Sequence, residues 1–191
     1  MNFSEYRKLT GRTMSDTGSK ITDSTHMSLG LNTEIMGELP EAVSKEDLIN
    51  FKEELGDAFW YLSNYCNLWN IDPVNNYEGS IKPEAFGALK LDKTSGQQYM
   101  IIFGMGQNIA LLQDLDKKHL AYAKHADETV RKTLVDDLYS SMEYLSFALG
   151  LSTDAIRDRN IAKLYARYPE SFDQDKAILR DLGVERAILE Q

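Results

Sequence analysis

Apolar residues recur at helical spacing along most of this chain, and few residues interrupt the pattern. Between residues 45 and 69 they stand three or four positions apart, at Leu48, Phe51, Leu55, Ala58, Phe59, Leu62 and Tyr65. This spacing places them on one face of a helix. Only four prolines occur in 191 residues, and proline is the strongest helix breaker. The sequence therefore predicts an all-α fold and, at this length, one domain over residues 1–191.

The same periodicity gives the expected helices. Their approximate ranges are 2–14, 24–43, 45–69, 98–124, 127–149 and 153–167, followed by a last helical segment from about 173 to the end. Residues 15–25 are rich in Ser, Thr, Asp and Gly and are predicted to form a loop. Residues 71–97 are rich in turn residues, so we expect a surface excursion there with one short helix.

Composition narrows the function classes. The formal net charge is −9, which disfavours general nucleic-acid binding because that needs a basic surface. No run of 18 apolar residues occurs and the N-terminus is polar, so neither a membrane span nor a signal peptide is expected. The lone cysteine, Cys66, lies in an apolar helical stretch and is expected to be a buried structural thiol. These features predict a cytoplasmic protein.

Two acidic pairs stand near the start of the chain, Glu38 with Glu41 and Glu54 with Asp57. Residues spaced i, i+3 lie on one face of a helix. Packed carboxylates repel unless they are protonated, solvated or joined by a cation. Mg²⁺ takes oxygen ligands of this kind and commonly brings substrate phosphates with it. A solvated acidic face is the alternative, but the second pair is embedded among apolar positions, where unpartnered acids are costly.

Pro40 is the anomaly in the first acidic helix. A proline inside a helix costs about 3 kcal/mol or more, so we expect the helix to kink there or to end and restart. Glu34, Glu38 and Glu41 are expected on one face at i, i+4 and i+7. Because Glu41 follows Pro40, its position is the least secure, and Glu34 could supply the missing oxygen instead.

Gly37 and Gly56 each precede an acid within a predicted helix. Each costs about 1 kcal/mol of helix propensity relative to alanine. Close helix approach, or room for a ligand, would explain both glycines.

The two acidic motifs, in this order, resemble the signature of the MazG-like all-α nucleoside triphosphate pyrophosphohydrolases, which is ExxE, a spacer and then ExxD. The segment 160–172, NIAKLYARYPESF, is similar to the family's N-x-x-K-L-x-x-R-Y-P-x-x-F segment. Tyr6 and Arg12-Thr13 also look like phage and bacterial members. The resemblance covers about 1–72 and 153–191.

The resemblance implies a four-helix core, to which residues of about 73–150 would add a helical insert. It also implies hydrolysis of a nucleoside triphosphate to the monophosphate and pyrophosphate. Mg²⁺, or Mn²⁺ in its place, would be held by Glu38, Glu41, Glu54 and Asp57, and Glu38, Glu41 or Glu34 would take the proton of the attacking water. The substrate would be bound by Asn160, Lys163, Arg167, Tyr168 and Tyr61. A homo-oligomer, dimer or tetramer, in a bacterial or phage-infected cell is further implied.

Two alternatives stay open. Residues 51–63 resemble 134–146 at a constant offset, with Ser140 in place of Asp57. This similarity is either chance or a degenerate duplicate that has lost the metal ligands, as in an all-α dUTP pyrophosphatase with a degenerate second half. With such a duplicate, the chain could form within one subunit a four-helix core that relatives build from two. The other alternative is a helical nucleotide-sensing or interaction module without turnover, against which the intact acids argue.

The remaining aromatic and histidine residues receive structural expectations. Trp60 and Trp69 are predicted in the core. His26 is predicted to be a surface histidine near a helix start. It also lies twelve residues before Glu38, where some members of the resembled family have a histidine near the substrate. His119 and His125 lie in a lysine-rich helix and are assigned no role.

Overall fold

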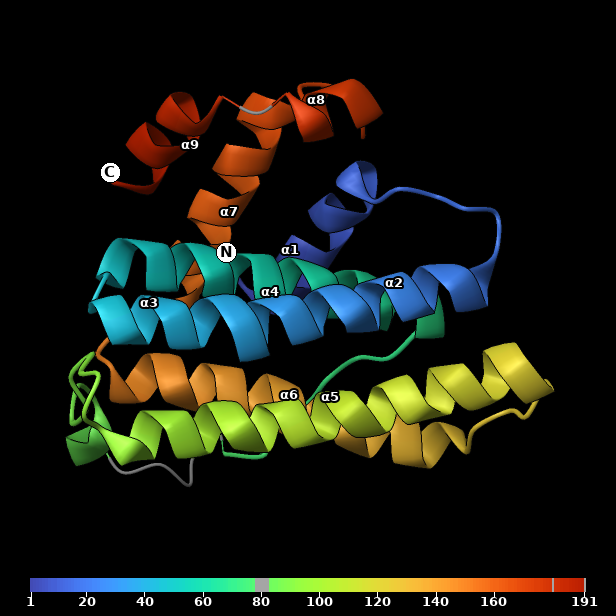
Figure 1. Ribbon diagram of the computed structural model, residues 1–191, viewed down its shortest axis with the longest axis horizontal. Helices are drawn as coiled ribbons and strands as arrows, with labels where there is room; N and C mark the ends of the chain where they lie inside the picture. The colour runs from blue at the N-terminus through green and yellow to red at the C-terminus, as the bar shows by residue number, and fades with distance from the viewer. Residues whose placement is uncertain (78–82, 180, 191) are drawn as a thin grey trace.

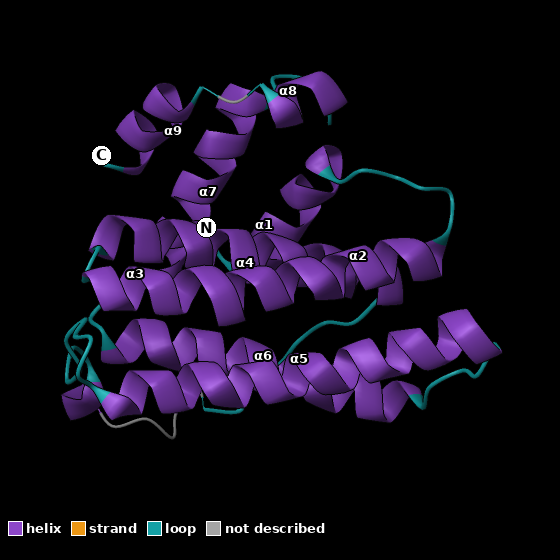
Figure 2. Ribbon diagram, viewed as in Figure 1, coloured by secondary structure: helices purple, strands orange, loops and turns teal. Residues whose placement is uncertain are grey.

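The computed structural model describes residues 1–77, 83–179 and 181–190, and these residues form helices and loops without any strand (Figure 2). The α-helices are α1 Phe3–Thr10, α2 Lys20–Thr33, α3 Leu39–Lys45, α4 Leu48–Trp69, α5 Gly96–Tyr122, α6 Glu128–Ala148, α7 Thr153–Arg167, α8 Gln174–Ile178 and α9 Leu182–Leu189. The shorter elements are the 3-10 turns η1 Gly11–Thr13 and η3 Pro83–Ala85, and the π-helical turn η2 Glu34–Glu38. The predicted all-α fold is confirmed.

The elements can be compared with the expected ranges, and the largest difference is at the start of α2. Helix α2 begins at Lys20 because the side chain of Ser19 accepts the N–H of Thr22 and caps it, so residues 20–25, predicted as loop, are helical. In the excursion over 71–97 the described short helix is η3, and residues 78–82 lie outside the described ranges. The C-terminal segment divides into α8 and α9.

The core is a four-helix bundle (Figure 1). Helices α2, α3 and α4 form one layer, and α5 and α6 form the layer beneath it. Each layer contributes wholly or almost wholly buried apolar side chains, among them Leu31, Ile35, Leu55, Phe59, Ile102, Met105, Leu138 and Met142. The residues expected as an insert, about 73–150, thus supply two of the four core helices.

The segments that resemble each other lie in α4 and α6, one in each layer of the bundle (Figure 1). On α6 the polar positions contact the segment that follows α4. The hydroxyl of Ser140 accepts the N–H of Asn76 at 2.8 Å, and Asp137 accepts the side-chain amide of Asn76 at 3.2 Å. The positions on α6 that correspond to Glu54 and Asp57 therefore bind the protein's own chain, and a duplication stays a hypothesis.

The helix that carries the first acidic motif continues through Pro40. Helical backbone runs from Lys20 to Lys45, and at η2 the N–H of Leu39 donates to the carbonyl of Glu34, five residues back. A π turn of this kind inserts one residue into an α-helix. Pro40 falls in the first turn of α3, where its missing N–H is tolerated. The expected kink or break is therefore replaced by a π turn immediately before the proline.

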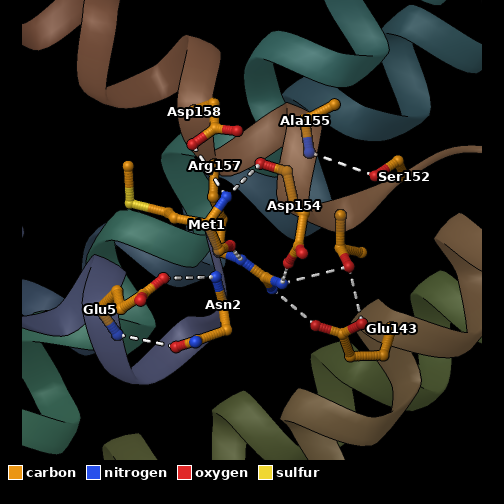
Figure 3. A network of polar contacts seen from close by, with 10 residues as sticks. Met1, Asn2, Glu5, Glu143, Ser152, Asp154, Ala155, Arg157 and Asp158 are labelled. Carbon is orange, nitrogen blue, oxygen red and sulfur yellow. Dashed lines mark hydrogen bonds and ion pairs between the residues drawn. The ribbon is translucent and has the colours of Figure 1, made fainter.

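Helix α7 is fixed against the bundle by Arg157, whose side chain is 3% exposed. Its guanidinium donates to Glu143 of α6 and to Asp154, each at 2.6 Å, and to the carbonyl of Met1 at 3.2 Å. The amino group of Met1 pairs with Asp158 at 2.8 Å (Figure 3). This network holds the first residues, α6 and α7 in one arrangement, and α7 carries the basic residues of the site.

Of the two glycines before acids, only Gly56 marks a close helix approach. A Cβ at Gly56 would lie 3.2 Å from the Cβ of Asn160 on α7. A Cβ at Gly37 would meet nothing within 4 Å. Close packing therefore explains Gly56 and not Gly37.

Two further expectations concern burial. Cys66 is buried, and this burial raises the pKa of its thiol to about 12, which fits the predicted structural role. Within the described ranges, no helix combines the length and the apolar character needed to span a membrane.

Candidate active site

A cavity of about 380 Å³ is formed by η1, α2, η2, α4, α7 and the segment after α7. It is lined by Thr13, Ser15, His26, Glu34, Asp57, Trp60, Tyr61, Leu164, Arg167, Tyr168, Phe172 and Ala177. Carboxylates and a guanidinium thus share one cavity with several aromatic rings. Such a lining suits a ligand that has both a charged part and a flat ring.

Three acidic side chains from η2 and α4 interact at this cavity. Protonated Glu34 donates a hydrogen bond to Glu54, and Asp57 acts on both through its charge. Burial, together with the charges of Asp57 and Glu54, raises the pKa of Glu34 to about 9. Burial and the charges of Asp57 and Glu53 raise the pKa of Glu54 to about 7. At neutral pH the cluster therefore retains a proton on Glu34.

Two residues of α7, Asn160 and Lys163, donate hydrogen bonds to the carboxylate of Asp57. The ammonium of Lys163, which is wholly buried, donates to both carboxylate oxygens of Asp57 at 2.7 Å and to Glu53 at 3.2 Å. Burial alone would lower the pKa of Lys163, but the charges of Asp57 and Glu53 outweigh it and raise the pKa. Asn160 donates to Asp57 at 2.6 Å and accepts the hydroxyl of Tyr6 at 2.6 Å. Asn160 and Lys163 thus contact the acid cluster instead of lining the cavity.

The first acidic motif does not lie as expected. The prediction that Glu34, Glu38 and Glu41 share one face is wrong. Glu34 lines the cavity, whereas the side chain of Glu41 is 51% exposed and pairs with Lys45. The additional residue of the π turn rotates the helix face on which later residues lie, which turns Glu41 away. Glu38 ends the π turn and is half-buried.

Three of the predicted substrate residues line the cavity together. Tyr61 packs against Gly30 of α2, where a Cβ would overlap its ring. Tyr168 is 4% exposed. The guanidinium of Arg167 lines the cavity and also binds Glu185 of α9 at 2.8 and 2.6 Å. Their roles toward a substrate stay predictions.

Trp60 and His26, for which structural roles were expected, also line the cavity. Trp60 was expected in the core. It is partly buried and packs against the core, as does Trp69, and it also lines the cavity, where its indole N–H donates to the hydroxyl of Thr13 at 2.8 Å. His26 is exposed, as expected, yet it lines the same cavity with its ring 6.1 Å from that of Tyr61. The signals were in the sequence, because His26 lies eight residues before Glu34 and Trp60 three after Asp57, each on the same helix face.

The donor set fits a hard divalent cation by its chemistry. In the described ranges no three His, Cys, Asp or Glu side chains form a complete ligand set, and Lys163 occupies both oxygens of Asp57. Burial, and after it the negative charge of neighbouring acids, raises the pKa values of Glu34 and Glu54, and a cation would offset the charge part of this effect. Mg²⁺ binds to one or two carboxylates, water and substrate phosphates more often than to a protein cage.

Residues 24–75 match the family model of the MazG nucleotide pyrophosphohydrolase domain. The match takes in most of α2 together with η2, α3 and α4, and so includes all the acids of the two motifs. No curated protein and no solved structure matches the chain. The resemblance expected from the acidic motifs is confirmed over the matched residues, while α1 and α7 lie outside them.

Proposed function

We propose that the MazG nucleotide pyrophosphohydrolase domain of this chain hydrolyses a nucleoside or deoxynucleoside triphosphate to the monophosphate and pyrophosphate. The observation that carries the proposal is the cluster of Glu34, Glu54 and Asp57 at a cavity lined by aromatic rings. In the reaction a water oxygen bonds to the α-phosphorus, the bond to the bridging oxygen between the α- and β-phosphorus breaks, and pyrophosphate leaves.

The proposed ligands of Mg²⁺, or of Mn²⁺ in its place, are Glu34, Glu38, Glu54 and Asp57. Glu34 takes the place first considered for Glu41, because Glu34 interacts with Glu54 while Glu41 pairs with Lys45. A bound divalent cation would neutralise phosphate charge and lower the pKa of a coordinated water.

Glu34 is also the best-supported candidate to take the proton of the attacking water, with Glu38 as the second. A general base works best when its pKa lies near the operating pH. The pKa of Glu34 is about 9 without a cation, and a nearby cation would bring it down toward neutrality. Glu41 is not proposed as the general base, because it pairs with Lys45 on the exposed face of α3.

The remaining residues divide into two groups. Arg167 lines the cavity and is proposed to bind phosphate, while Tyr61, Trp60 and Tyr168 offer ring faces or edges to the nucleobase. Asn160 and Lys163 are proposed to act through Asp57, whose carboxylate they hold in place. This reassigns Lys163 from a phosphate ligand to a residue that orients an acid.

A homo-oligomer, dimer or tetramer, in the cytoplasm remains part of the proposal. Large apolar side chains on the outer side of α5 support it, since Met100, Phe103 and Leu111 are each more than half exposed. Light scattering coupled to size-exclusion chromatography measures the mass directly, and a monomer at micromolar concentration would contradict it.

The test is pyrophosphate release from a panel of common and deoxynucleoside triphosphates with Mg²⁺ or Mn²⁺. We expect metal-dependent release that Glu54→Gln abolishes, while Glu46→Gln, on the exposed turn before α4, leaves release unchanged. Release from dUTP alone would favour the dUTP pyrophosphatase reading. Binding of triphosphates without any release would favour the sensing module and overturn the proposal.

A further inference from the structure

We infer that Arg12 is a positioning residue for the nucleoside side of the cavity, which rests on the proposed function. Arg12 does not line the cavity itself. It lies in η1, at the end of the first helix, and contacts the segment after α7 that contributes two aromatic cavity residues, Tyr168 and Phe172.

Arg12 joins this segment at three points. Its Nη1 donates to the carbonyl of Tyr168 and to the carbonyl of Glu170, each at 2.6 Å. Its own carbonyl accepts the N–H of Phe172 at 3.3 Å. Its guanidinium also stacks over the ring of Tyr165, 4.1 Å from the ring centre. One side chain thus ties the last turn of α7 and the following segment to η1.

The segment it holds has no regular structure of its own. Helix α7 ends at Arg167 and α8 begins at Gln174. The N–H of Tyr168 still donates to the carbonyl of Leu164 at 2.7 Å, but the segment beyond Tyr168 is not helical until α8. The rings of Tyr168 and Phe172 lie 5.6 Å apart and both line the cavity. Their place in the cavity wall therefore depends on contacts made by the segment's backbone. Three of these contacts end on Arg12, two on its guanidinium and one on its carbonyl.

The neighbouring residue of η1 orients a third ring. Thr13 accepts the indole N–H of Trp60 at 2.8 Å and donates to the carbonyl of Thr10 at 3.0 Å. The short turn η1 therefore contacts both α4 and the segment after α7, and it positions aromatic side chains from both at the same cavity. The hydrogen bonds of Arg12 and Thr13 reach the aromatic residues of the cavity and not the acid cluster. We therefore expect a change in η1 to weaken binding of the nucleoside and to leave binding of the phosphates unchanged.

The experiment compares Arg12→Ala and Arg12→Lys with the wild-type enzyme. Two constants are measured, the KM for the best triphosphate and the inhibition constant of pyrophosphate, which has no nucleoside. We expect Arg12→Ala to raise the KM by about tenfold to a hundredfold, since small misplacements of binding groups cost up to about 10²-fold. The inhibition constant of pyrophosphate should stay unchanged. Arg12→Lys keeps the charge but not the planar fork and should fall between the two.

The matched control is Arg7→Ala. Arg7 lies on α1, pairs with Asp72 at 3.1 Å and donates to Asn67 at 3.1 Å, and none of these residues lines the cavity. We expect the control to change neither constant. Circular dichroism checks folding, and Arg12→Lys carries the test if Arg12→Ala does not fold.

The outcomes separate the two proposals. If Arg12→Ala lowers kcat but leaves the ratio of KM to the inhibition constant of pyrophosphate unchanged, Arg12 has only a structural role, and the inference is overturned. If the wild-type enzyme releases no pyrophosphate from any triphosphate, the proposed function fails, and the same ratio is then measured as dissociation constants by calorimetry. If Arg12→Ala binds the triphosphate more weakly than the wild type and pyrophosphate equally well, the positioning role of Arg12 is still supported. If the variant and the wild type bind the triphosphate equally well, that role is rejected.

Discussion

The ammonium of Lys163 donates to both carboxylate oxygens of Asp57 at 2.7 Å, although 106 residues separate them in the chain. The contact joins α7 to α4 and is almost wholly shielded on the lysine side, whose side chain is 1% exposed. A buried charge of this kind is tolerated only with a partner. The pair thus fixes both the packing of α7 and the orientation of one proposed metal ligand.

Removing the buried cation should destabilise the fold. Lys163→Met leaves Asp57 and Glu53 without its ammonium, and breaking a buried pair costs about 3–5 kcal/mol. The free energy of unfolding from urea titration measures this loss. Lys45→Met, at the exposed pair with Glu41, is the control and should leave the urea midpoint unchanged. Equal midpoints for both variants would show that the Lys163 pair is not stabilising.

Stability without metal should fall as pH rises. Glu34 and Glu54 have folded-state pKa values of about 9 and 7, above their ordinary value of 4.5. The folded state therefore binds more protons than the unfolded state in this range, and the free energy of unfolding decreases with pH. Their protonated forms stabilise fully below about pH 4.5, and the loss is complete above about pH 9 for Glu34. Urea titrations with a chelator at pH 5, 7 and 9 measure this.

Glu34→Gln supplies the control for the pH effect. The amide cannot ionise, so the variant should lose less stability than the wild type between pH 5 and pH 9. A wild-type stability that is constant or rising over this interval would contradict the buried acid pair.

The two ends of the first acidic helix should behave differently in catalysis. Glu34→Gln is expected to reduce kcat by about 10²-fold or more, the size of effect of a lost general base. Glu41→Gln should retain nearly full activity, because Glu41 pairs with Lys45 on the exposed side. Pyrophosphate release at saturating triphosphate measures both. The reverse order would restore Glu41 as the general base and reject the role assigned to the π turn.

Two glycines of the same helix provide a packing test. Gly30→Ala would overlap the ring of Tyr61, and overpacking of this kind costs about 1–3 kcal/mol. Gly37→Ala meets nothing within 4 Å and should be neutral or stabilising by up to about 1 kcal/mol. Thermal unfolding ranks the two variants. Because Tyr61 lines the cavity, Gly30→Ala should also raise the KM, and an unchanged KM would place Tyr61 outside the binding site.

Magnesium should stabilise the fold more at high pH than at low pH. Carboxylates must lose their protons to bind a metal, and Glu34 and Glu54 retain theirs up to about pH 9 and 7. At a magnesium concentration of 100 times the dissociation constant the gain is about 2.7 kcal/mol. Thermal unfolding with and without Mg²⁺ at pH 6 and pH 9 measures it. Glu54→Gln should lose the shift, and a shift that persists in that variant would place the metal elsewhere.

Much of the fold followed from local patterns. The apolar spacing in α4 predicted a helix ending at Trp69, where it ends, and α7 has the predicted bounds. Burial of Cys66 followed from the same stripe. These predictions succeeded because helical periodicity is a property of neighbouring residues. The start of α2 was missed because the cap at Ser19 lies inside a polar segment that also reads as loop.

The site was predicted less completely. The sequence marked two acidic motifs and the basic residues of α7, and it named Glu34 as one of three candidate bases and as a substitute metal ligand for Glu41. Trp60 was predicted in the core, and it does pack against the core, but the sequence did not indicate that it also lines the cavity and donates a hydrogen bond to Thr13. Whether a side chain on a given helix face is buried depends on which other elements pack against that face.

The sequence by itself determined an all-α chain with a matched MazG segment and an unusual concentration of acids on two consecutive helices. The tertiary structure decided which of those acids meet. The packing of α2 and η2 against α4 brought Glu34 to Glu54, the π turn at Glu34–Glu38 turned Glu41 outward, and α7 brought Lys163 to Asp57. The physical reason is that helical spacing sets only the relative directions of side chains, whereas hydrogen-bond register and packing partners distant in the chain set the groups that those side chains face.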